Sequence, residues 1–190
     1  MRKIYIDARD FQHDIWTLAA KVADDAAFAP DVIVSLWRGG AAVGIGIQEF
    51  LAAKGRKTTN IPLVCKSYAG IGESTGKAVF TGLECVLDEI AAVGGRLGRR
   101  ARVLVADDIF DTGATARDVR ETLGGVCDMR LAAVYVKSGV AAVAKEPEYH
   151  VKRLAEWTVF PHEIEGLAQC EIREKSEMLA RLMGVLEEGA

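Results

Sequence analysis

Apolar positions recur along the chain with two different periods. Within residues 10–28 they lie three or four positions apart, which is the spacing of an amphipathic helix. Short continuous apolar runs predict buried strands instead, and these are residues 31–36, 61–66, 102–106 and 131–136. Helical patterns between the strands cover residues 40–54 and 112–123. Strands that alternate with helices are typical of a parallel sheet covered on both faces.

The pattern predicts an α/β protein with one domain over residues 1–190, a mainly parallel central sheet and a small hood. Its core would cover about residues 28–140, and a hood segment about residues 145–165. A charged amphipathic helix would end the chain at about residues 171–188. Residues 84–100 are longer than a simple connection requires, so we expect an extra short helix there, which could serve an oligomer or partner contact.

Composition excludes several classes of protein. Half of the residues are hydrophobic, and 24 basic against 27 acidic residues give a net charge of −3, which provides no general attraction for nucleic acid. No run of about 18 apolar residues indicates a membrane span. The four cysteines are scattered without a CxxC pair, so we expect reduced thiols, no zinc site and a cytoplasmic location.

Carboxylates and small hydroxyl residues follow the strand predicted at residues 102–106. Asp107 and Asp108 come first, and the segment then continues with Asp111, Thr112, Gly113, Ala114 and Thr115 into a helix. Free N–H groups and hydroxyls at a helix N-terminus suit a phosphate dianion. The paired aspartates can accept hydrogen bonds from ribose hydroxyls or engage a hydrated Mg²⁺. The alternative is that the aspartates only end a strand, with Asp111 or Thr112 as a helix cap.

The whole run of residues 103–115, VLVADDIFDTGAT, resembles the phosphoribosyl diphosphate (PRPP) signature of the type I phosphoribosyltransferases. The resemblance implies their Rossmann-like fold and Mg²⁺-dependent transfer of a phosphoribosyl group. It also implies that Asp107 and Asp108 hold the ribose hydroxyls and approach the metal, largely through PRPP or water. Asp111 would contact the proton of the base nitrogen. The residues around the 5′-phosphate would be Asp111, Thr112, Gly113, Ala114 and Thr115.

Two further segments resemble parts of the same family. Arg38 precedes Gly39 and Gly40 at the start of a predicted helix, where a fixed cation and exposed N–H groups suit a diphosphate. This segment resembles the family's diphosphate loop, in which the peptide before the basic residue is often cis. Alternatively, Arg38 lies on a surface turn before a glycine cap.

Ser67 and Tyr68 begin a polar, glycine-rich stretch over residues 68–81. In purine members of the family, a Ser-Tyr pair introduces a loop that closes over the diphosphate and excludes water. The resemblance therefore implies that Ser67 and Tyr68 belong to the PRPP site. Ordinary strand-end residues are the alternative.

Candidate base-binding residues follow the last clear strand. Lys137 ends it, and the segment EWTVFPHE over residues 156–163 lies downstream. The pairing resembles the hypoxanthine, guanine and xanthine phosphoribosyltransferases, which implies that Lys137 donates to a purine 6-oxo group and Trp157 stacks on the ring. Backbone groups at Thr158 and Val159 would contact the purine edge, and Glu163 would approach the metal. Alternatively, Lys137 is a solvated lysine and Trp157 a core aromatic residue.

These motifs together predict a purine phosphoribosyltransferase that uses PRPP and Mg²⁺, with Asp111, Arg38 and Lys137 as the residues that carry the reaction. We expect a homo-oligomer, a dimer or tetramer, with no membrane or nucleic-acid partner. Two alternatives remain. One is a phosphoribosyltransferase for another nucleobase, and the other is a non-catalytic regulator that senses PRPP or a nucleotide. Local basic residues at 96–102 are the feature that would suit such a regulator.

Overall fold

The computed structural model describes residues 3–66, 78–139 and 142–185. The chain divides into two compact units, of which the larger is Arg9–Ala155. The smaller unit combines Met1–Ala8 with Glu156–Ala190. The segment predicted as a hood, residues 145–165, therefore contributes to both units.

The larger unit is built on a six-stranded sheet in the order β4-β3-β2-β5-β6-β7. Every neighbouring pair is parallel except β3 and β4, which confirms the mainly parallel sheet. The strands are β2 (Val32–Trp37), β3 (Thr59–Lys66), β4 (Val79–Thr81), β5 (Arg102–Phe110), β6 (Asp128–Lys137) and β7 (Tyr149–Leu154). The apolar runs form its centre because parallel strands are buried on both faces.

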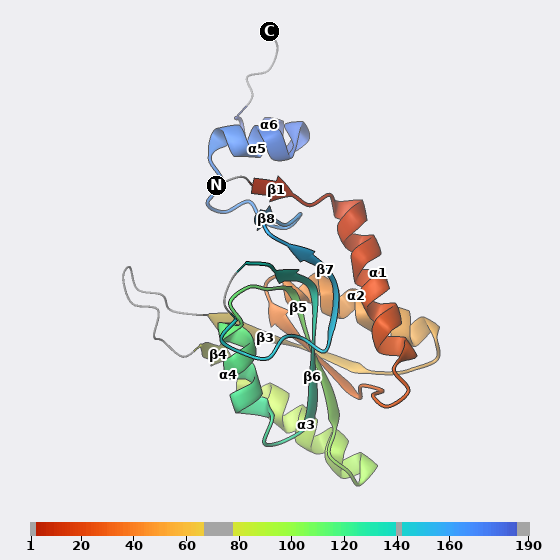
Figure 1. Cartoon of the computed structure of the whole chain (residues 1–190). Coiled ribbons are helices and arrows are strands. Elements are labelled where there is room, and N and C mark those ends of the chain that lie inside the picture. Colours follow the sequence, from red (N-terminus) through yellow and green to blue (C-terminus); the bar gives the residue numbers. More distant parts are fainter. Residues whose placement is uncertain (1–2, 67–77, 140–141, 186–190) are drawn as a thin grey trace. The chain divides into compact units, whose positions relative to one another are not determined.

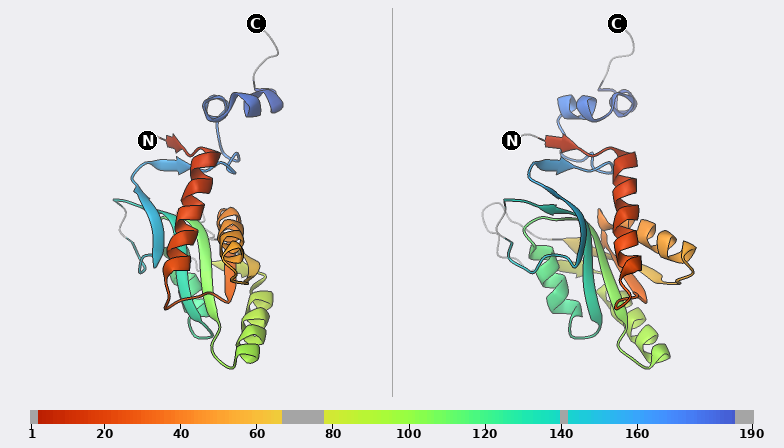
Figure 2. Two further views of the ribbon diagram at one scale, coloured as in Figure 1. Left: turned by 90° about the vertical axis from the view of Figure 1, so that its right-hand side faces the viewer. Right: turned by 45° about the vertical axis from the view of Figure 1, so that its right-hand side comes forward.

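Helices cover both faces of this sheet, as predicted. Figures 1 and 2 show α1 (Ala8–Asp24) and α2 (Gly40–Ala53) on one face. The other face carries α3 (Leu83–Leu97) and α4 (Ala114–Leu123). A hydrophobic core cluster lies between that second pair of helices and the sheet, and it includes Val34, Val105, Leu131, Val86, Ile90 and Val119.

Hydrogen bonds to the buried Asp14 carboxylate connect α1 to the sheet. The Asp14 carboxylate accepts hydrogen bonds from the Tyr135 hydroxyl at 2.7 Å and from the Lys152 ammonium at 2.8 Å. Burial, together with the Asp14 carboxylate, raises the pKa of Tyr135. Because these partners come from β6 and β7, the two hydrogen bonds connect α1 to two adjacent strands.

Three helix predictions change in detail. The N-terminal helix occupies Ala8–Asp24, so it begins and ends earlier than the predicted residues 10–28. The short helix predicted within residues 84–100 is part of α3, which has 15 residues and spans Leu83–Leu97. The helix predicted from residue 112 begins at Ala114, because Gly113 adopts a left-handed conformation with φ +82°.

The smaller unit contains two strands and two short helices. β1 (Lys3–Tyr5) pairs in parallel with β8 (Trp157–Val159). The prediction of one terminal helix over residues 171–188 is wrong, because α5 (Gln169–Lys175) and α6 (Glu177–Leu182) are separate. Ser176 between them has an extended backbone, and its hydroxyl accepts a hydrogen bond from Leu179 N–H at 3.2 Å. Among the described residues, no helix has the length and apolar character needed to cross a membrane.

Close packing of α2 on β2 gives the first testable prediction. A Cβ atom on Gly44 would lie 1.7 Å from the Ser35 hydroxyl oxygen, which donates a hydrogen bond to Asn60 at 2.7 Å. We expect Gly44→Ala to lower the free energy of unfolding by about 1–2 kcal/mol in urea denaturation, although alanine favours helix. Gly95→Ala in α3 is the control, because its Cβ would meet nothing within 4 Å. Equal stability of the two variants would contradict the packing described.

Candidate active site

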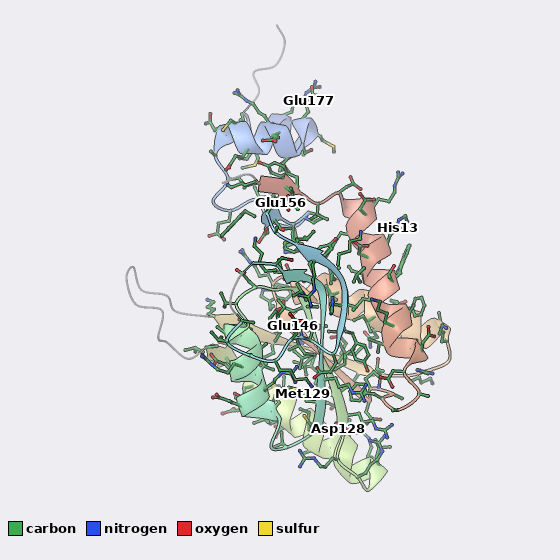
Figure 3. The ribbon with its side chains drawn as sticks, viewed as in Figure 1. His13, Asp128, Met129, Glu146, Glu156 and Glu177 are labelled. Carbon is green, nitrogen blue, oxygen red and sulfur yellow. The ribbon has the colours of Figure 1, made fainter. Side chains whose placement is uncertain are left out.

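Three of the predicted functional segments lie at one edge of the sheet. β2, β5 and β6 are parallel neighbours, so their carboxyl ends lie together. Arg38 follows β2, Asp111 follows β5, and Lys137 is the last residue of β6. Figure 3 labels Asp128 and Met129 at the other end of β6. Ligands of open α/β sheets bind at the carboxyl edge, so the larger unit presents its candidate chemistry there.

The loop after β2 lies directly against the aspartate pair. A Cβ atom on Gly39 would be 2.0 Å from the nearer Asp108 carboxylate oxygen, and one on Gly40 would be 2.2 Å from the Ala106 carbonyl oxygen. Only glycine permits so close an approach. The Trp37–Arg38 peptide bond in this loop is cis. The predicted diphosphate loop and the predicted ribose site are therefore adjacent.

Asp107 and Asp108 lie within β5 and not after it, which corrects the predicted strand end at residue 106. The strand continues because Asp107, Ile109 and Phe110 pair with residues of β6. Asp108 is buried, and one of its carboxylate oxygens accepts a hydrogen bond from Ile109 N–H at 2.8 Å. Burial, and after it the neighbouring Asp108 carboxylate, raises the pKa of Asp107 well above its usual range. The carboxylates of Asp107 and Asp108 thus lie close together where little water reaches them.

The turn from β5 into α4 forms a small pocket. The pocket has a volume of about 80 Å³, enough for several water-sized groups, and its lining includes Asp107, Asp111, Thr112, Gly113, Ala114 and Thr115. The N-cap residue of α4 is Gly113, which has no side chain to cap the helix. The Ala114 N–H donates to the Thr112 hydroxyl at 3.3 Å. A helix N-terminus of this kind can receive an anion.

Cys65 is a neighbour of this pocket that the sequence analysis did not select. Burial raises the pKa of its thiol to about 11, an effect that the Asp107 carboxylate reinforces and the Thr115 side chain opposes. Cys65 lies in β3, on the opposite side of β2 from β5. In the β2–β3 register Val64 lies beside Trp37, so Cys65 comes next at the carboxyl edge of the sheet.

Asp118 is a second residue that the sequence analysis missed. It is buried in α4 and accepts hydrogen bonds from Ala78 N–H at 2.6 Å and from Arg117 Nε at 2.9 Å. It therefore ties the residue before β4 to the helix that begins at the pocket. Ser67 and Tyr68, predicted in the PRPP site, lie outside the described residues.

The predicted base-binding residues are divided between the two units. Lys137 is partly buried at the end of β6, whereas Trp157, Thr158 and Val159 form β8 of the smaller unit. The Trp157 side chain is 51% exposed, so it is not the core aromatic residue of the alternative interpretation. The Val159 carbonyl accepts a hydrogen bond from Ile6 N–H at 3.0 Å. Binding of a base by these four residues stays a prediction.

A divalent metal ion was predicted near Asp107, Asp108 and Glu163. Among the described residues, no group of three or more His, Cys, Asp or Glu side chains is arranged to hold a metal ion. The paired oxygen donors Asp107 and Asp108 nevertheless suit Mg²⁺, and a cation would offset the burial and the neighbouring charge that raise the pKa of Asp107. This donor set fits a magnesium ion that brings most of its ligands with a substrate or water. In the smaller unit, the Glu163 carboxylate accepts a hydrogen bond from Phe160 N–H at 2.9 Å.

Solved structures identify the fold. A purine phosphoribosyltransferase from Pyrococcus horikoshii is 24% identical with a TM-score of 0.65, over 88% of this chain and 98% of that chain. A xanthine-guanine-hypoxanthine phosphoribosyltransferase from Helicobacter pylori is 14% identical with a TM-score of 0.59, over 86% and 95%. A hypothetical protein from Neisseria gonorrhoeae with bound ppGpp is 20% identical with a TM-score of 0.68, over 96% and 97%.

The chain therefore has the type I phosphoribosyltransferase fold, as predicted from the run at residues 103–115. No family model matches the sequence, and no curated protein matches it.

The raised pKa of Asp107 gives a prediction about stability and pH. A carboxyl group whose pKa is higher in the folded than in the unfolded chain stabilises the fold only while it is protonated. That contribution is complete below the unfolded pKa of about 3.9 and is lost as the pH rises through the folded pKa. Asp107→Asn avoids this loss, so we expect the ligand-free variant to be more stable than the unsubstituted chain at pH 7.

The difference should shrink as the pH falls towards 4, as measured by urea unfolding at both pH values. Asp88→Asn is the control, because Asp88 is exposed on α3. An Asp107→Asn variant that is less stable than the unsubstituted chain at pH 7 would contradict the electrostatic account.

Proposed function

We propose that this protein transfers the 5-phosphoribosyl group from PRPP to a 6-oxopurine, releasing diphosphate and a nucleoside 5′-monophosphate. The observation that carries the proposal is the close approach of Gly39 to Asp108. It brings the loop that contains Arg38 against the carboxylate pair of β5, and Asp107 of that pair also lines the pocket at the start of α4. PRPP has a diphosphate, a ribose diol and a 5′-phosphate in one molecule, and these three features match the three parts of the site.

The sugar end of PRPP would bind along β5 and α4. Asp107 and Asp108 would accept hydrogen bonds from the ribose hydroxyls, which would relieve part of the repulsion between the carboxylates. The 5′-phosphate would occupy the pocket at the start of α4 and receive the N–H groups and hydroxyls there. The residues proposed around this phosphate are Asp111, Thr112, Gly113, Ala114 and Thr115.

The diphosphate would lie beside Arg38, Gly39 and Gly40. Arg38 would supply a permanent positive charge, and the glycines would allow the chain to approach the phosphate oxygens. Mg²⁺, held by Asp107 and Asp108 largely through PRPP or water, would neutralise charge on the departing diphosphate. Ser67 and Tyr68, which lie outside the described residues, are proposed for the same part of PRPP.

The acceptor base would be recognised by Lys137 and by residues of β8. Lys137 would donate to the 6-oxo group, Trp157 would stack on the ring, and backbone groups at Thr158 and Val159 would contact its edge. The bond between a purine nitrogen and ribose carbon 1 would form as the bond from that carbon to the diphosphate oxygen breaks. The bonding electron pair leaves with the diphosphate, and the N–H proton of the purine passes to Asp111.

The solved purine phosphoribosyltransferases of the same fold support this choice of acceptor. The four cysteines, all free in the structure, suit a reducing compartment, and we propose that the protein works in the cytoplasm as a homo-oligomer.

A second candidate function is nucleotide sensing without catalysis. The Neisseria gonorrhoeae protein with bound ppGpp matches this chain over almost its whole length. Guanosine tetraphosphate also combines a ribose with diphosphates, so it would suit the same anion sites. Calorimetric binding of ppGpp by a chain that releases no diphosphate from PRPP with any base would favour sensing over transfer.

Turnover is tested by diphosphate release from PRPP and Mg²⁺ with hypoxanthine, guanine, xanthine, adenine and uracil in turn. We expect release with at least one 6-oxopurine and a decrease in kcat of about 10²–10⁴-fold in Asp111→Ala, because a positioned proton acceptor is lost. Asp128→Asn is the control, since Asp128 is exposed at the other end of β6. Release with no purine would exclude the proposed reaction.

The role of Lys137 is tested by its alanine variant. Losing a charged donor to the 6-oxo group should raise the KM for the 6-oxopurine by about tenfold or more and leave the KM for PRPP nearly unaltered. Lys145→Ala is the matched control, because the Lys145 side chain is 75% exposed and forms an ion pair with Glu148. A Lys137→Ala variant with unchanged base affinity would instead favour a phosphoribosyltransferase for another nucleobase.

A further inference from the structure

The residue that follows β8 has its peptide groups bound on both sides. Phe160 N–H donates to the Glu163 carboxylate at 2.9 Å. The Phe160 carbonyl accepts from the Lys175 ammonium at 2.5 Å and from Glu163 N–H at 3.0 Å. The Phe160 side chain is buried and stacks on His162, with ring centroids 5.6 Å apart. We call this set of contacts among Phe160, Glu163 and Lys175 the Phe160 clamp.

Lys175 reaches the clamp from a separate element. It is the last residue of α5, and Ile172 of the same helix is buried. Burial lowers the pKa of Lys175, and the Glu163 carboxylate opposes that effect. A partly desolvated ammonium is costly unless it has an acceptor, so the Phe160 carbonyl and the Glu163 carboxylate together compensate its burial.

The clamp adjoins the proposed base-binding segment. Val159, immediately before Phe160, is buried and its carbonyl is bound by Ile6 N–H at 3.0 Å. The chain is therefore fixed at two consecutive residues, Val159 and Phe160. The half-exposed indole of Trp157 lies only two residues before Val159 on the same short strand. Small rotations of that strand would change the direction of the ring and of the Thr158 peptide.

We propose that Lys175 is a positioning residue for the purine base, acting with Glu163 through the Phe160 clamp. The inference rests on the proposed function and adds a residue to it. Lys175 touches no reacting atom. It holds the backbone that presents Trp157, Thr158 and Val159, and so contributes to base affinity with little effect on PRPP. Glu163 accepts the Phe160 N–H in the clamp, a role that its prediction as a metal residue did not include.

The test compares Lys175→Met, which keeps the length of the side chain but removes the donor, with Lys175→Arg, which restores a cationic donor. Arg173→Met is the control on the same helix, because Arg173 binds the Val185 carbonyl at 2.6 Å and not Phe160. Two quantities are measured in the full chain. They are the amide hydrogen exchange of residues 157–160, 162 and 163, and the separate KM values for the 6-oxopurine and for PRPP.

We expect faster exchange at Phe160 and a KM for the base about tenfold higher in Lys175→Met, with the KM for PRPP within about twofold of the unsubstituted chain. Lys175→Arg should recover most of the base affinity, and Arg173→Met should resemble the unsubstituted chain. The unaltered KM for PRPP would show that the larger unit remains folded.

Three results would overturn the inference. Unchanged exchange at Phe160 in Lys175→Met would show that the clamp does not hold the segment. Faster exchange with an unchanged KM for the base would show that the clamp is structural only, and equal increases in both KM values would show a general defect. Absence of turnover in the unsubstituted chain is a different outcome, because it would reject the proposed function and the positioning role with it.

Discussion

The contact between Gly39 and Asp108 is the constraint on which the candidate site depends. At this point the backbone after β2 runs so close to a carboxylate of β5 that a side chain on residue 39 would overlap it. The contact is available only because β2 and β5 are parallel neighbours whose carboxyl ends coincide. Arg38 immediately precedes Gly39 in the chain, so the proposed diphosphate loop lies next to the proposed sugar site.

The adjacent carboxylates at this edge of the sheet are typical of a site that binds a ligand. Asp107 and Asp108 are adjacent in the sequence, and burial, followed by the neighbouring Asp108 carboxylate, raises the pKa of Asp107. In the free protein this arrangement costs stability, whereas ribose hydroxyls or a divalent cation would offset it. Groups with perturbed pKa values are concentrated at functional sites for this reason. The buried Asp14 carboxylate of the same chain pairs with the Lys152 ammonium and accepts a hydrogen bond from the Tyr135 hydroxyl.

Much of this architecture is predictable from the sequence, because the central strands are apolar runs and the turn into α4 has a distinctive composition. The elements that were missed have weak local signals. β1 has only three residues, and β7, with the sequence YHVKRL, is too polar to be recognised as a sixth strand. The amphipathic pattern continues through Ser176, so the break between α5 and α6 depends on the extended backbone there and not on hydrophobic period. Cys65 and Asp118 interact with Thr115 and Ala78, which lie 50 and 40 positions away in the sequence, and no local pattern shows such pairs.

The central claim is that the loop after β2 and the β5–α4 turn bind one ligand together. Isothermal titration calorimetry of the unsubstituted chain and of Gly39→Ala, with PRPP and with ribose 5-phosphate in the presence of Mg²⁺, tests it directly. The account predicts that PRPP binds the unsubstituted chain more tightly than ribose 5-phosphate does, and that Gly39→Ala weakens PRPP by about tenfold or more, because the new methyl group displaces Asp108 or the loop. Equal affinity of PRPP for the two chains, or no binding of PRPP to the unsubstituted chain, would contradict it.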